Sequence, residues 1–303
     1  MTSPSAPYAR TGRIVVGVDG SPASTLALEW ACHQAGLLNR SLHLVHTYVV
    51  SVAYAGVGSF STALESDLTL MAAAAEETLA DALSAARALA PDTDITSATV
   101  EGSAAAALVD ASSGAYAVVT GARGRGPLTS TLLGSVSTQV AMHAHSPVVV
   151  VKAFSDSADR GHGVVVGFDG SEHAQACLAF AFEQAAARGT SLDVVNVWPL
   201  EPGHGTASAA DAVSTLREIG PSHQLFVDEV LAEWTEKYPD VEVHASVVHG
   251  HAVPVLLEHS ATAELLVVGS RGRGGFTGLV LGSVSHTVLQ RAECPVAVVR
   301  GLT

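Results

Sequence analysis

The sequence predicts an α/β protein made of two tandem, doubly wound domains, each with a mainly parallel sheet of five strands. Two observations predict this fold: the chain of 303 residues repeats itself once, and each copy alternates apolar runs with helical patterns. We expect the domains over residues 10–153 and 163–301, which are ordinary lengths for single domains.

Four sequence blocks recur in the same order about 150 residues apart, which indicates a duplication. IVVGVDGS returns as VVVGFDGS, and GARGRG returns as GSRGRG. LLGSVS returns as VLGSVS, and SPVVVVK returns as CPVAVVR. The segment that joins the copies, residues 154–163, is polar and has no periodicity, as expected of a linker.

Nearly continuous apolar, β-branched runs predict strands that are buried on both faces, as in a parallel sheet covered by helices. In the first copy these strands are Arg13–Val18, Ser41–Thr47, Thr96–Glu101, Ala115–Gly121 and Pro147–Lys152. Helix-forming stretches lie between them and recur in the second copy: Pro22–Leu38, Ser66–Ala90, Ala104–Ser112, Ser135–His143, Glu172–Arg188, Ser222–Tyr238, Ala252–Ala261 and Ser283–Arg291. Val49–Glu65 and Pro199–Pro221 are expected to be mobile loops with part of a helix.

Composition excludes several classes of protein. The net charge is −14 and only 15% of residues are charged, which argues against binding to nucleic acid or to an anionic membrane. No apolar run approaches the roughly 20 residues that a membrane span needs, and no secretory signal is recognisable. Three widely spaced cysteines form neither a disulfide framework nor a zinc pattern. We therefore expect a cytoplasmic protein.

The strongest functional signal is a glycine motif: Gly-x-x-Gly, nine residues, then Gly-Ser. It begins at Gly121 and again at Gly269, each time between a buried strand and a helix. Glycines let backbone N–H groups approach an anion closely, and a helix N-terminus favours negative charge at the same place. A single copy would be read as a glycine-rich turn, but two copies with identical spacing favour a phosphate-binding loop.

Asp19 and Asp169 follow the first strand of each copy, where a carboxylate could hold a ribose hydroxyl or a Mg²⁺ ion bound to phosphate. The alternative is helix capping or an Asx-turn in Asp-Gly-Ser. Recurrence opposite the glycine motif favours the ligand role. A P-loop is absent, because it requires Gly-Lys, which never occurs in the chain. The dinucleotide fingerprint G-x-G-x-x-G is absent as well, because the near match at Gly124 and Gly126 has Thr129 in place of the third glycine and does not follow the first strand.

These blocks resemble the universal stress protein family, in its ATP-binding branch and its tandem actinobacterial type. The resemblance extends over nearly the whole chain, once in each half. It implies flavodoxin- or Rossmann-like domains with ATP at the carboxyl edge of each sheet. It also implies that domains pair through their last strands, as an intrachain pseudo-dimer, and a homodimer of whole chains is expected as well. The ATP would be accompanied by Mg²⁺.

The resemblance, together with the glycine motif, gives the expected nucleotide-binding residues. In the first domain these are Gly17, Asp19, Thr47, Gly121, Ala122, Arg123, Gly124, Arg125, Gly126, Pro127, Gly134, Ser135, Val136 and Ser137. In the second domain they are Gly167, Asp169, Val197, Gly269, Ser270, Arg271, Gly272, Arg273, Gly274, Gly275, Gly282, Ser283, Val284 and Ser285.

The function expected is an ATP-binding stress-response regulator that acts as a nucleotide-dependent switch, with an unidentified protein as its partner. Beyond the two aspartates, no carboxylate or histidine is placed to activate water, so an enzyme is not expected. Two alternatives stay open: a slow ATP hydrolase or phosphotransferase, and a module that binds cyclic AMP.

Overall fold

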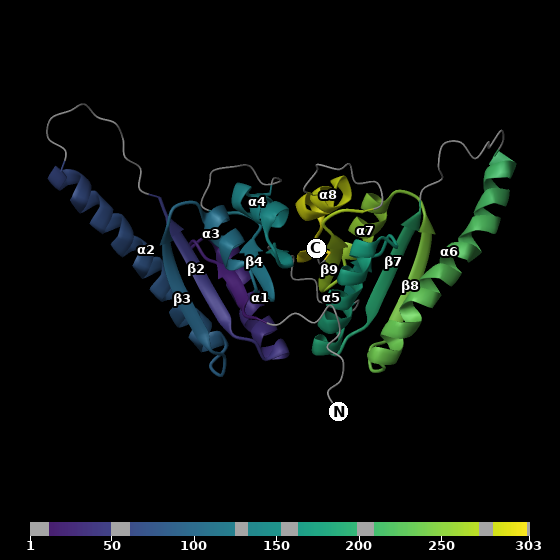
Figure 1. Ribbon diagram of the computed structural model, residues 1–303, viewed down its shortest axis with the longest axis horizontal. Helices are drawn as coiled ribbons and strands as arrows, with labels where there is room; N and C mark the ends of the chain where they lie inside the picture. Colours follow the sequence, from purple (N-terminus) through teal and green to yellow (C-terminus); the bar gives the residue numbers. More distant parts are fainter. Residues whose placement is uncertain are drawn as a thin grey trace. The chain divides into compact units, whose positions relative to one another are not determined.

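Five strands pair in parallel in each half of the chain, and helices cover both faces of the strands. The structure is a computed structural model, and it describes residues 12–49, 61–124, 133–152, 163–198, 209–272 and 281–301. It divides into an N-terminal unit, Arg10–Ala153, and a C-terminal unit that includes Phe154–Thr303. The elements follow the same order in both units (Figure 1).

The N-terminal unit has the strand order β3-β2-β1-β4-β5, which places β1 and β4 at its centre. Helices α1 and α2 pack on one face, and α3 and α4 pack on the other. The strands are β1 Ile14–Gly17, β2 Leu42–Tyr48, β3 Ile95–Glu101, β4 Ala117–Gly121 and β5 Val148–Val151. The helices are α1 Pro22–Leu38, α2 Ser61–Leu89, α3 Ala104–Ala111 and α4 Ser135–His143.

The C-terminal unit repeats this arrangement with the strand order β10-β9-β6-β7-β8. Its strands are β6 Val164–Gly167, β7 Leu192–Trp198, β8 Val243–His249, β9 Leu265–Gly269 and β10 Val296–Val299. Its helices are α5 Glu172–Arg188, α6 Ala209–Lys237, α7 Ala252–Ser260 and α8 Ser283–Arg291. The predicted fold class is therefore confirmed, with all carboxyl ends of a unit's paired strands at one edge.

Valine-rich strands make the core, since the side chains of β1, β4 and β9 are almost entirely removed from water. Two central glycines show how the helices approach the sheet. A Cβ on Gly121 would lie 2.5 Å from the carbonyl oxygen of Ala23, in α1, and a Cβ on Gly17 would lie 2.8 Å from Leu108 Cδ1, in α3. These two positions therefore face opposite layers, and both layers pack closely on the strand ends.

The two long helices begin earlier than the sequence predicts. Helix α2 begins at Ser61 instead of Ser66, and α6 begins at Ala209 instead of Ser222. Pro221 lies inside α6, although an interior proline removes a backbone hydrogen bond and usually breaks a helix. The two segments expected to be loops with part of a helix are thus helical over residues 61–65 and 209–221, while residues 50–60 and 199–208 lie outside the described part of the chain.

All three cysteines are buried, and burial together with the nearby Glu29 raises the pKa of Cys32 to about 11. Only the thiolate attacks thiol reagents. A rise of about two pKa units lowers the thiolate fraction of Cys32 about 100-fold at pH 8. We expect the native chain to react with a maleimide at least about 100-fold more slowly than the chain in guanidinium, measured by mass spectrometry. Rapid labelling of the native chain would contradict this packing.

Candidate functional site

Two aspartates occupy equivalent places at the carboxyl edge of the two units. Asp19 follows β1, and its Oδ1 accepts a hydrogen bond from the backbone N–H of Ser21 at 2.9 Å. Asp169 follows β6, and its Oδ1 accepts from the N–H and the hydroxyl of Ser171, at 3.0 and 2.7 Å. The Asx-turn that the sequence left as an alternative is therefore present, and it holds one carboxylate oxygen of each aspartate in place.

The second carboxylate oxygen of each aspartate lies against the glycine motif. A Cβ on Gly124 would lie 2.6 Å from Asp19 Oδ2, and a Cβ on Gly272 would lie 2.6 Å from Asp169 Oδ2. Any other residue at these positions would displace the carboxylate. The structure thus brings together the aspartate and the glycine motif, which are about 100 residues apart in the sequence, in the same way in both units.

The helices that follow the motif start without a side-chain cap. Gly134 and Gly282 are the N-cap residues of α4 and α8, and neither helix has a side-chain hydrogen bond at its cap. By contrast, Ser21 caps α1 through its hydroxyl. The first N–H groups of a helix have no partner within it, and the helix dipole adds positive potential there. Both helices therefore offer donors to an anion.

Ser137 and Ser285, which the sequence places at the binding site, also have a structural role. The hydroxyl of Ser137 donates to the carbonyl oxygen of Gly121 at 2.7 Å, and that of Ser285 donates to Gly269 at 2.5 Å. Both serines are 3% exposed. Their hydroxyls fasten each helix start to the preceding strand, so what they offer a ligand is the backbone N–H, whereas Ser135 and Ser283 are exposed.

A cavity of about 280 Å³ opens at the carboxyl edge of the N-terminal unit. Its polar end includes Asp19, Gly124 and Ser135, and its apolar end includes Val45 and Leu108. Small-ligand sites are typically concave and mostly apolar with a few polar groups. The cavity is lined by Gly17, Val18, Asp19, Ser24, Val45, Thr47, Ala104, Leu108, Thr120, Gly121, Arg123, Gly124, Leu133, Gly134, Ser135, Val136 and Ser137.

Two positioning residues are not apparent from the sequence because their types differ between the units. His46 Nδ1 lies 2.6 Å from the carbonyl oxygen of Val18, and Asn196 Nδ2 donates to that of Phe168 at 2.7 Å. Each carbonyl belongs to the residue just before the aspartate. Both side chains are buried, so they fix the end of β1 or β6 from the next strand. The sequence does hold one signal for them, since His46 and Asn196 occupy equivalent positions in the two copies of the repeat.

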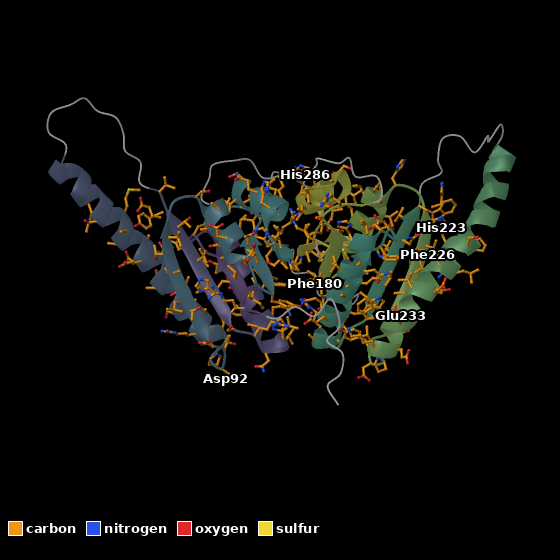
Figure 2. The ribbon with its side chains drawn as sticks, in the orientation of Figure 1. Asp92, Phe180, His223, Phe226, Glu233 and His286 are labelled. Carbon is orange, nitrogen blue, oxygen red and sulfur yellow. The ribbon has the colours of Figure 1, made fainter. Side chains whose placement is uncertain are left out.

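An aromatic cluster surrounds the end of β7, next to Val197. Trp198 stacks on His223 with ring centroids 5.1 Å apart and meets His249 edge-on at 4.9 Å. Phe168 stacks on Phe226 at 6.1 Å. His223 and Phe226 both come from α6 (Figure 2), whereas Trp198 and His249 are the last residues of β7 and β8. Trp198 is only 7% exposed, as expected of a packing residue.

Positive charge lies beside the glycine motif in an acidic chain. Arg123 lines the cavity of the N-terminal unit. In the C-terminal unit, burial and the nearby charge of Arg271 lower the pKa of Arg300, which follows β10. Two cations close enough to interact favour an anion next to them.

Some expected residues of the motif cannot be placed. Arg125, Gly126, Pro127, Arg273, Gly274 and Gly275 lie outside the described residues. Ala122 and Ser270 have backbone roles, because their carbonyl oxygens accept from Gly134 and Gly282 at 2.8 and 2.7 Å. Across the described ranges, no three His, Cys, Asp or Glu side chains gather as a metal site. None of the helices that are described has the length and apolar character needed to cross a membrane.

Comparison with known proteins gives a single family for both halves. The model of the universal stress protein family matches residues 11–152 and again 162–300. A universal stress protein of Mycolicibacterium smegmatis is 37% identical over 299 residues, which are 95% of this chain and 96% of the relative. A universal stress protein of Mycobacterium tuberculosis is 36% identical over 304 residues, covering 95% of this chain and 94% of the relative.

Solved structures share the fold. The crystal structure of a universal stress protein from Archaeoglobus fulgidus matches with a TM-score of 0.67 at 21% identity, and it covers 96% of this chain and 98% of its own. A functionally unknown protein from Pseudomonas aeruginosa matches with a TM-score of 0.64 at 15% identity, covering 95% and 92%. Because the family model matches both halves and the relatives align over nearly their full length, this chain belongs to the universal stress protein family.

Proposed function

We propose that this chain is an ATP-binding regulator of the stress response, with one nucleotide site in each domain. The observation that carries the proposal is the arrangement built twice: a glycine with no room for a side chain faces an aspartate beside a helix start that has no side-chain cap. Two copies of the chain that both keep an anion-binding geometry are a stronger signal than one.

The residues of the N-terminal cavity fit an adenine nucleotide. The N–H groups at the start of α4 and the glycine backbone would hold phosphates, and Arg123 would add charge. Asp19, which lies against Gly124, would be in reach of a ribose hydroxyl. Val45, Leu108 and Thr47 would surround the base, and the corresponding position in the other domain is Val197.

Mg²⁺ fits this site only as an ion carried by the nucleotide. Each unit offers a single aspartate there, and across the described ranges no cluster of three metal ligands exists. Mg²⁺ commonly binds through one or two carboxylates plus phosphate oxygens. Asp19 and Asp169 are the residues that would complete its coordination when ATP is bound.

The proposal is tested by what the purified protein carries and binds. Nucleotide released on denaturation, identified by mass spectrometry, should be ATP. Titration calorimetry of the stripped chain with ATP should give two sites per chain. Release of cyclic AMP, or tighter binding of it than of ATP, would favour the alternative ligand, and no binding of either nucleotide would refute the proposal.

We further propose that binding changes the protein's surface instead of serving catalysis. The groups described in the site recognise ground-state phosphates, whereas catalysis needs contacts that strengthen in the transition state. Hydrogen exchange with and without ATP should show protection beyond the site itself, which a partner protein could sense. Steady-state turnover near the roughly 10 per second of typical enzymes, lost in Asp19→Ala, would instead assign an ATP hydrolase. Pairing of domains through their last strands, and of chains as a homodimer, stays a prediction.

A further inference from the structure

A row of side chains crosses the floor of the N-terminal cavity. In the parallel register Gly17 pairs with Val45, and Val16 pairs with Val119, so Gly17 lies beside Thr120. Val45, Gly17 and Thr120 all line the cavity. They point toward the layer of α3, since a Cβ on Gly17 would meet Leu108. The side chain of Leu108 therefore covers Gly17, next to Thr120, and borders this part of the cavity.

Thr120 carries a buried hydroxyl that the described part of the protein does not satisfy. The residue is 3% exposed, and its Oγ1 has no hydrogen-bond partner there. Burying a hydroxyl without a partner costs free energy, and buried polar groups are nearly always paired. Because Oγ1 has no protein hydrogen bond to lose, rotation about χ1 to meet a ligand in the cavity would break none.

The C-terminal unit has valine at the equivalent position. Val166 pairs with Val267, so Gly167 lies beside Val268, and a Cβ on Gly167 would lie 3.7 Å from Val268 Cγ1. Thr and Val have nearly the same shape, so the two units differ here by a hydroxyl in place of a methyl group. The difference continues at the next lining position, where Thr47 corresponds to Val197.

The hydroxyl lies in one row with Gly17 and Val45, on the side of the sheet that Leu108 covers, and the neighbouring side chains Val45 and Leu108 make this end of the cavity apolar. A nucleobase has apolar faces and polar edge atoms, so it is the part of a nucleotide that suits this end. A threonine hydroxyl both donates and accepts, and it can therefore pair with an amino group or a ring nitrogen.

We propose that Thr120 is a specificity-determining residue, whose hydroxyl hydrogen-bonds the polar edge of the base in the N-terminal site. Val268 gives the C-terminal site only apolar contact at this point, so the two sites of one chain bind ATP with different affinity. This inference rests on the proposed function, and it goes beyond it by separating the two sites.

The test measures one site at a time in the full-length chain. With the C-terminal site disabled by Gly272→Val, adding Thr120→Val should weaken ATP binding about tenfold in calorimetry, the effect of one lost hydrogen bond. The same substitution should raise the thermal midpoint of the ligand-free chain by roughly 2–4 °C, because it removes an unsatisfied hydroxyl. If Thr120 had only a structural role, Thr120→Val would not weaken ATP binding while it raises the thermal midpoint of the ligand-free chain.

The reciprocal substitution is the matched control. With the N-terminal site disabled by Gly124→Val, Val268→Thr should lower the ligand-free thermal midpoint and strengthen ATP binding. Tripolyphosphate, which has no base, should bind the Thr120→Val chain and its parent equally. ATP affinity within twofold of the parent, or weakened tripolyphosphate binding, would overturn the role of Thr120. Failure of the unsubstituted chain to bind ATP at all would instead overturn the proposed function.

Discussion

Replacing Gly124 with valine is expected to abolish ATP binding in the N-terminal domain while leaving the fold intact. The new Cβ would lie 2.6 Å from Asp19 Oδ2, so the carboxylate must turn away and lose its hydrogen bond from the N–H of Ser21. The γ-methyl groups would also occupy space beside the phosphate position. Loss of the charged hydrogen bonds at this point is expected to weaken binding at least about 100-fold, or roughly 2.7 kcal/mol.

The same substitution at Gly272 should remove the C-terminal site, because Asp169 Oδ2 lies at the same 2.6 Å. Calorimetry should therefore show one site in either single variant and none in the double variant. Gly124 and Gly272 are both exposed, so circular dichroism should match that of the parent. Gly36→Ala, where a Cβ meets nothing within 4 Å, is the control that should keep both sites. A double variant that still binds ATP twice would refute the assigned position of the phosphates.

Replacing Gly121 with alanine is expected to destabilise the N-terminal domain by about 2–3 kcal/mol, the upper part of the range for overpacking a core. The added Cβ would lie 2.5 Å from the carbonyl oxygen of Ala23 and 2.6 Å from its carbonyl carbon. These are backbone atoms of α1, so relief requires the whole helix to move from β4. Urea denaturation followed by circular dichroism measures the loss of stability.

Two other alanine substitutions make the comparison specific. Gly36→Ala, inside α1 and unobstructed, should stabilise the helix by about 0.5–1 kcal/mol. Gly269→Ala is the counterpart in the C-terminal unit, and its Cβ would lie 2.9 Å from the carbonyl oxygen of Arg271, a milder clash. Equal stability of Gly121→Ala and the parent would show that α1 packs less closely on β4 than the structure indicates.

The sequence predicted the fold well for two reasons. Apolar β-branched runs are local patterns that mark buried strands, and the repeat shows that each pattern occurs twice. The starts of α2 and α6 were placed too late, and for α6 the predicted helix began only after Pro221, which the helix in fact contains. The repeat itself held the better signal, since α2 and α6 occupy equivalent stretches of the two copies and are both 29 residues long.

The site was predicted where it depends on glycine spacing and missed where it depends on contacts across the sheet. That Asp19 meets Gly124, and Asp169 meets Gly272, follows from the order of parallel strands. Only its place in the repeat, equivalent to that of Asn196, distinguishes His46, which holds the end of β1, from the other histidines. Likewise, a buried threonine such as Thr120 looks like any strand residue until its missing hydrogen-bond partner is seen.

The paired roles of His46 and Asn196 show what a duplicated chain has tolerated as its copies diverged. An imidazole and a carboxamide differ in size and aromaticity, yet each makes a hydrogen bond to the equivalent carbonyl of its unit, one residue before the aspartate. What selection has retained at this position is thus a hydrogen-bonding nitrogen at a fixed place, and not a residue type. Each half of the chain is in this sense a natural multiple mutant of the other, folded in the same cell and subject to the same history. Positions that differ between the halves without changing the backbone mark where the fold accepts substitution.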